Sequence, residues 1–199
     1  MVNINWEYPP PRKGLAGALD KFIGPGATPA ELWLQIAAAV LAGLAAPAYA
    51  VLKGLDWSIW QLTVAGLFAA DLTGGIVTNA TSAAKRWYHR AGQGALQHFV
   101  FAAAHIGHVF VVAWLFRALD WVFFGVASSY LLIASLIILG APQYLRRPIA
   151  FLLYAVSLLV SLYALSPTPG LEWFLPFFYL KLLLSHLLRE EPYRPSRES

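Results

Sequence analysis

The sequence predicts an all-α integral membrane protein, folded as a bundle of six transmembrane helices. Of its 199 residues, 59% are hydrophobic and only 12% are charged. Soluble domains usually carry about 25% charged residues. Six apolar stretches have about the length of a membrane span, and no polar stretch between them is long enough for a soluble domain. These observations place the chain in the membrane class.

The expected helices match the ~20 residues that a bilayer requires. They are expected at residues 32–52, 57–79, 93–116, 121–140, 147–165 and 172–188. The first follows Thr28, Pro29 and Glu31, which are typical of a capped helix start. The Ser-Pro-Thr-Pro-Gly run at 166–170 predicts a turn before the last helix.

Three regions follow from this pattern. Residues 1–28 form a polar tail, residues 29–188 the six-helix membrane domain, and residues 189–199 a charged C-terminal tail. Within the first tail, residues 14–23 place apolar side chains at helical spacing. This segment is either a short interfacial helix or part of a solvated tail.

The basic residues predict the orientation. With six spans, one side collects most of them, whereas the other collects Lys53 and Arg117. Because cytoplasmic loops are rich in Lys and Arg, we expect both termini in the cytoplasm, in a plasma or inner membrane. Orientation also accounts for the net charge of +4, so no nucleic-acid partner is expected and membrane lipids are the expected partners. The absence of cysteine excludes disulfides and thiolate metal sites.

Polar side chains concentrate in the second and third expected helices. The second carries Asp71 and Asn79 on one face, and the third carries His98, His105 and His108 on one face. The two helices are joined by a short basic loop and are expected to be antiparallel neighbours. At 1.5 Å per residue, Asp71 then lies roughly 21 Å below the outer end of its helix, at about the level of His105, and can meet His105 or His108. Asn79, His98 and His89 form a second layer nearer the cytoplasm.

A carboxylate beside imidazoles is chemically suited to zinc or non-haem iron. The leading hypothesis is a metal-dependent membrane enzyme, a hydrolase or an oxidoreductase, acting on a lipid or apolar substrate from the cytoplasmic side. Its metal ligands would be Asp71, His105 and His108. His98 or His89 would be a further ligand or the general base, and Asn79 would orient a ligand or the substrate. An anionic head group would be held by Lys181, Arg86 and Arg90.

Other functions remain open at this point. A small proton-coupled transporter would use Asp71 and the histidine stripe as a protonation path. A haem protein would place His105 or His108 opposite His186. A non-enzymatic membrane subunit would need none of these groups for chemistry.

One local pattern resembles the CarF-type plasmanylethanolamine desaturases. Residues 70–75, Ala-Asp-Leu-Thr-Gly-Gly, are similar to an Ala-Asp-x-x-Ser/Gly-Gly start in that family. Residues 86–89, Arg-Trp-Tyr-His, followed by His98, resemble a fragment of its Arg-x-His-His…His pattern. Tyr88 replaces the first paired histidine, and Thr-Asn at 78–79 stands where the family has His-Trp. The resemblance, over residues 70–99, implies at most a shared scaffold or a reduced, mononuclear metal site.

Overall fold

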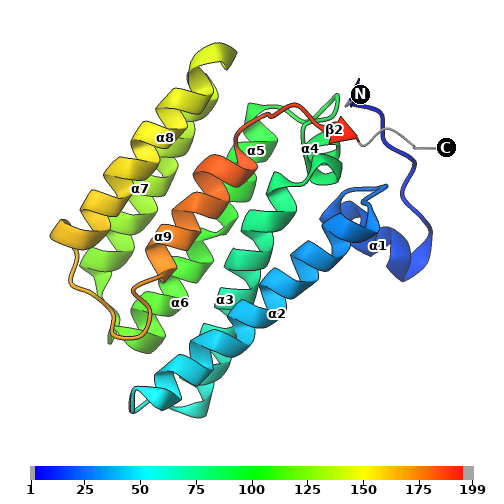
Figure 1. Cartoon of the computed structure of the whole chain (residues 1–199). Coiled ribbons are helices and arrows are strands. Elements are labelled where there is room, and N and C mark those ends of the chain that lie inside the picture. The colour runs from blue at the N-terminus through cyan, green and yellow to red at the C-terminus, as the bar shows by residue number, and fades with distance from the viewer. Residues whose placement is uncertain (1–2, 195–199) are drawn as a thin grey trace.

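The computed structural model describes residues 3–194, and nearly all of its regular structure is helical (Figure 1). The elements in chain order are β1 (Asn3–Ile4), α1 (Gly14–Ile23), α2 (Pro29–Leu52), α3 (Ile59–Ala80), α4 (Ser82–Tyr88), α5 (Ala95–Ala104), α6 (Ile106–Phe116), α7 (Trp121–Gly140), α8 (Gln143–Leu159), the π-helix η1 (Val160–Ala164), α9 (Phe174–Tyr179), the π-helix η2 (Leu180–His186) and β2 (Tyr193–Arg194). The two short strands pair antiparallel, so the ends of the described chain lie together.

Among the described residues, five helices are long and apolar enough to cross a membrane: Pro29–Leu52, Ile59–Ala80, Ala95–Phe116, Trp121–Gly140 and Gln143–Ala164. This confirms the helical class and agrees, within a few residues, with the first five expected spans. The sixth expected span corresponds to a shorter apolar helix, Phe174–His186. Six crossings and the orientation of the termini therefore stay predictions.

The short last helix, α9 continued by η2, is the centre of the bundle. It packs against α3, α7 and α8, and its large residues Phe174, Phe178, Leu182 and Leu183 are buried. A helix that is apolar on all sides is expected to be enclosed by other elements. Because protein rather than lipid surrounds it, its length need not match the thickness of the bilayer. By contrast, α2 and α8 expose many large apolar side chains, as lipid-facing helices do.

Small residues allow α2 and α3 to pack closely. A Cβ built on Gly66 would lie 2.9 Å from the Gly43 carbonyl oxygen, and one built on Gly74 would lie 2.9 Å from the Ala39 Cβ. Close approach through small residues is the usual way in which helices associate in lipid, where the hydrophobic effect gives no help.

The predicted start of the first span is confirmed. The Thr28 hydroxyl accepts from the Glu31 N–H at 3.2 Å, and the Glu31 carboxylate accepts from the Thr28 N–H at 2.7 Å. This capping box satisfies two N–H groups that have no partner within the helix. Glu31 also accepts from the backbone of Ala83 at 3.2 Å, which ties α2 to the start of α4.

The two ends of the bundle differ in charge. We call the end that carries α1, α4 and the two strands the basic end; it also carries Lys85, Arg146, Arg147 and Arg189. Figure 1 places the start of α5 and the chain's C-terminal strand at this same end. At the opposite end, Arg117 binds Asp120 and the Ser166 carbonyl.

Candidate functional site

The candidate site is centred on Asp71, one oxygen of which lies close to two basic side chains. Lys181 Nζ lies 2.6 Å from Asp71 Oδ2, and His108 Nε2 lies 3.2 Å from the same atom. The Lys181 side chain is 4% exposed, whereas the Asp71 side chain is 37% exposed. Asp71 Oδ1 has no hydrogen bond with any residue of the described chain. One carboxylate oxygen is therefore charge-paired, while the other has no partner among the described residues, on a side chain that is partly exposed.

Gly75 makes room for this pair. A Cβ at position 75 would lie 2.5 Å from Cε and 3.0 Å from Nζ of Lys181. Gly75 is one helical turn after Asp71, so both face the Lys181 side chain. The absence of a side chain at position 75 is what allows the ammonium group to reach the carboxylate.

His105 interrupts the third span at the depth of the site. Its Nδ1 donates to the Phe101 carbonyl at 2.8 Å, while its backbone N–H bonds to Ala102 instead. A side chain that takes the place of a backbone donor breaks the helical ladder, and the span accordingly divides into α5 and α6 at His105. The His105 ring stacks on the His108 ring with centroids 5.1 Å apart.

A second polar cluster lies nearer the basic end and is organised by His186 of η2. His98 Nδ1 lies 3.1 Å from His186 Nε2, and His186 Nδ1 lies 3.4 Å from Asn79 Oδ1. If His186 is neutral and donates to Asn79, then His98 donates to His186, so the proton positions form one ordered chain. The His89 ring stacks on that of His98 with centroids 4.4 Å apart.

His89 is fixed in one tautomer. Its Nε2 lies 3.2 Å from the His186 carbonyl, and because a carbonyl only accepts, Nε2 carries the proton. Burial, followed by the positive charges of its neighbours, lowers the pKa of His89 to about 3. His89 is therefore neutral at physiological pH, although it lies in a basic loop.

Phe101 separates the two clusters. Its ring stacks on His186 with centroids 3.9 Å apart and contacts His105 with centroids 4.6 Å apart. One aromatic ring thus stands between the deep group of Asp71, Lys181 and His108 and the group organised by His186.

Lys85 closes the basic end of the core helix. Its Nζ donates to the Ser185 carbonyl at 2.7 Å and to the Leu188 carbonyl at 2.6 Å. These are carbonyl groups at a helix C-terminus, where a cation also complements the helix dipole. Burial lowers the pKa of Lys85 to about 8, although Glu190 opposes the shift.

The three cations expected to hold a head group have different environments. Lys181 is bound to Asp71, as described above. Arg86 is almost fully buried. Arg90 stacks on Trp87, with its guanidinium carbon 3.7 Å from the ring centroid, and donates to the Trp87 carbonyl.

The residues expected to bind metal are only partly brought together. Asp71 contacts His108, whereas the nearest polar contact of His105 is the Phe101 carbonyl. Throughout residues 3–194, no group of three His, Asp or Glu side chains is positioned to hold one metal ion. The ammonium of Lys181 lies beside Asp71, in the position that a metal ion bound to this carboxylate would take.

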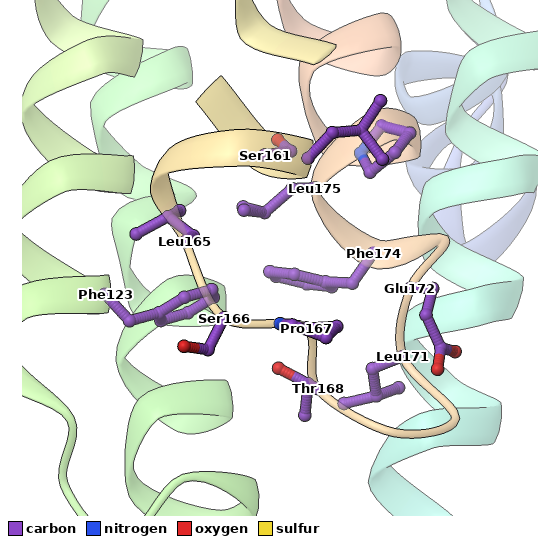
Figure 2. Close-up of a pocket in the computed structure, with 12 residues that line it drawn as sticks. Phe123, Ser161, Leu165, Ser166, Pro167, Thr168, Leu171, Glu172, Phe174 and Leu175 are labelled. Carbon is purple, nitrogen blue, oxygen red and sulfur yellow. The ribbon is translucent and has the colours of Figure 1, made fainter. Parts of the chain in front are cut away.

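The cavity shown in Figure 2 lies away from both clusters, at the opposite end of the bundle. It has a volume of about 240 Å³ and is enclosed by Phe123, the 165–171 turn and the start of α9. Its polar groups already serve the local structure: Thr168 accepts from Arg117 at 2.8 Å, and Glu172 accepts from the Gly170 N–H at 3.1 Å. This cavity therefore belongs to the packing of the turn.

The sequence did not reveal the roles of Lys181 and His186. At about 100° per residue, positions 181 and 186 are about 140° apart on an α-helix, which separates them. In η2 the hydrogen bonds run from i to i+5, so residues five apart are neighbours along the helix. Both side chains consequently reach α3. The sequence signal that could have indicated the Asp71–Lys181 pair was Gly75 in α3 together with Lys181, a lysine within an apolar helix.

The chain was compared with protein-family models, curated proteins and solved structures, and no significant match was found. The resemblance to the CarF-type desaturases thus gains no support and stays a prediction. The functional argument depends on the geometry of the site alone.

Proposed function

We propose that this protein is a proton-coupled membrane carrier whose proton-binding group is Asp71. The observation that carries the proposal is the difference between the two carboxylate oxygens. Oδ2 is held by Lys181 and His108, while Oδ1 is left for a proton on a side chain that is partly exposed. Ionisable residues within membrane spans commonly mark proton or ion pathways.

The pairing with Lys181 supplies the coupling. While Asp71 is ionised, its charge balances the buried ammonium. A proton on Oδ1 removes that balance and leaves Lys181 as a buried cation, which is strongly unfavourable in a medium of low dielectric constant. Binding of a small anion beside Lys181, or separation of the pair, restores a favourable state. Protonation is thereby linked to solute binding, and a small anion is the class of solute that this arrangement suits.

Two features bear on this mechanism. η2 carries Lys181 as well as His186, and π-helical turns are frequent at functional sites. The His98–His186–Asn79 chain lies on the side of Phe101 that faces the basic end, so a movement of the Phe101 ring would be needed for proton exchange between it and the deep site. We place the basic end in the cytoplasm, because Lys and Arg are enriched there.

Infrared difference spectroscopy of membrane-reconstituted protein tests the assignment. Lowering the pH should produce the C=O stretch of a protonated carboxyl group, shifted in D₂O, and Asp71→Asn should remove that band. Asp56→Asn is the matched control, because Asp56 is exposed in the turn before α3. A band unchanged by Asp71→Asn would show that Asp71 does not take up a proton, and the proposal would fail. Vesicles loaded with a pH-sensitive dye then identify solutes that move with the proton.

The metal-dependent lipid enzyme stays the alternative, since a carboxylate and several imidazoles are all present at the site. Elemental analysis of the same preparations separates the two functions. Stoichiometric zinc or iron that is lost in Asp71→Asn would favour the enzyme over the carrier. An absorption spectrum of the same sample tests the haem alternative, which requires a Soret band.

A further inference from the structure

We propose that a cavity at the basic end binds the phosphate of an anionic phospholipid. The cavity has a volume of about 550 Å³ and lies between the ends of α3, α8 and the core helix. It is lined by residues from α4, α8 and the segment that leads to β2, among them Lys85, Gln143, Arg146, Arg147, Arg189 and Glu190. This site is independent of Asp71 and of the carrier function.

Positive charge dominates the lining. Four basic side chains line the cavity, against the two carboxylates Glu190 and Glu191. Glu190 is already within 3.7 Å of Lys85 Nζ. Basic pockets between helices on the cytoplasmic side are typical binding sites for anionic head groups.

Lys85 and Arg146 are held by backbone carbonyls and keep the shape of the cavity, whereas the other two cations have N–H donors available for a ligand. Arg146 donates to the carbonyls of Ala141 and Leu139, both at 3.0 Å, and so holds the end of α7 against the start of α8. Arg147 is exposed and makes no hydrogen bond or ion pair with any described residue. The guanidinium of Arg189 lies over the Trp6 ring at 4.3 Å, which leaves its N–H edge for an acceptor. Guanidinium groups bind phosphate in a bidentate manner.

The surroundings favour a lipid over free phosphate. The Tyr144 side chain lines the cavity and is 80% exposed, and Leu145 next to it is also exposed. Below them, Leu136 and Ile137 of α7 and Phe151 and Leu152 of α8 are exposed large apolar side chains. A phosphate in the cavity would thus have its acyl chains beside surfaces that already face lipid. Tyr at such a level is typical of a membrane interface.

Binding of short-chain phosphatidylglycerol, short-chain phosphatidylcholine and inorganic phosphate to the full chain in detergent tests the proposal. We expect saturable binding of phosphatidylglycerol, clearly tighter than that of the other two. Each basic residue near an anionic head group contributes about a factor of five, so Arg147→Gln should weaken binding about fivefold and the Arg147→Gln/Arg189→Gln double variant about 25-fold.

Lys53→Gln is the matched control, since it removes an exposed positive charge at the opposite end, and it should leave the affinity unchanged. Circular dichroism verifies that each variant is folded. Equal affinity for the two lipids, or equal effects of Lys53→Gln and Arg147→Gln, would overturn the site. Phosphate binding as tight as that of phosphatidylglycerol would overturn the lipid assignment.

Discussion

The pair formed by Asp71 and Lys181 makes the most direct quantitative prediction. Removing one partner of a fully buried ion pair destabilises a protein by about 3–5 kcal/mol, because the other charge stays buried and unpaired. Asp71→Asn leaves Lys181, which is 4% exposed, in that position. Since the Asp71 side chain is 37% exposed and partly screened, we reduce the expected destabilisation to about 2–3 kcal/mol.

The reverse variant should be milder. Lys181→Met leaves Asp71 with His108 and partial access to solvent, and we expect a loss of about 1–2 kcal/mol. The double variant contains neither charge, so we expect it to lose only about 1 kcal/mol, which corresponds to a coupling energy of about 3 kcal/mol between the two residues.

Thermal unfolding in detergent micelles, followed by circular dichroism at one scan rate, measures these differences. For a chain of this size 1 kcal/mol corresponds to about 2–4 °C, so Asp71→Asn should lower the Tm by about 5–10 °C. The double variant should recover about half of that loss. Lys53→Met is the control for removal of a charge and should have little effect. Strictly additive effects of the two single variants would refute the inferred pairing.

Three further predictions concern other parts of the molecule. Gly75→Ala should destabilise the protein by about 1–2 kcal/mol, because the gain in helix propensity is smaller than the clash with Lys181, whereas Gly107→Ala, whose Cβ meets nothing within 4 Å, should stabilise it by up to about 1 kcal/mol in the same melting assay. The pKa of Lys85 is lowered to about 8, so between pH 8 and the unfolded-state pKa near 10.5 the unfolded state binds more protons than the folded state. The free energy of unfolding of the wild type should therefore rise with pH in that window, by up to about 3 kcal/mol relative to Lys85→Met, and parallel pH profiles of the two proteins would contradict this. Leu15 is 92% exposed on α1, and because the chain has no cysteine, a spin label on Leu15→Cys reports whether α1 lies in the lipid interface; accessibility to a water-soluble relaxant equal to that of a free peptide would exclude it.

Part of the candidate site could be predicted from the sequence. The expected contact between Asp71 and His108 is present, and so is the second layer of Asn79, His98 and His89. Helical periodicity sufficed for Asp71, Asn79 and His98, because α3 and α5 keep regular geometry near them. The break at His105 was not foreseen, since it arises from a hydrogen bond between the His105 side chain and the Phe101 carbonyl.

The sequence by itself determined where the five long apolar helices lie, how the first one begins and which end of the bundle is basic. Those properties depend on runs of apolar residues, on local capping groups and on the charges of short loops, all of which act over a few residues. Local hydrophobicity could not show that the last helix is the core, because lipid-facing and protein-facing spans are equally apolar.

Only the tertiary structure decided that Lys181 pairs with Asp71 and that His186 pairs with Asn79. Lys181 and His186 lie more than 100 residues further along the chain, and their common direction depends on the π-helical geometry of η2. That geometry is favourable only where packing against α3, α7 and α8 and the bond from Lys85 to the helix end compensate for the lost α-helical hydrogen bonds. Long-range packing, rather than residue spacing, therefore placed the lysine beside the acid.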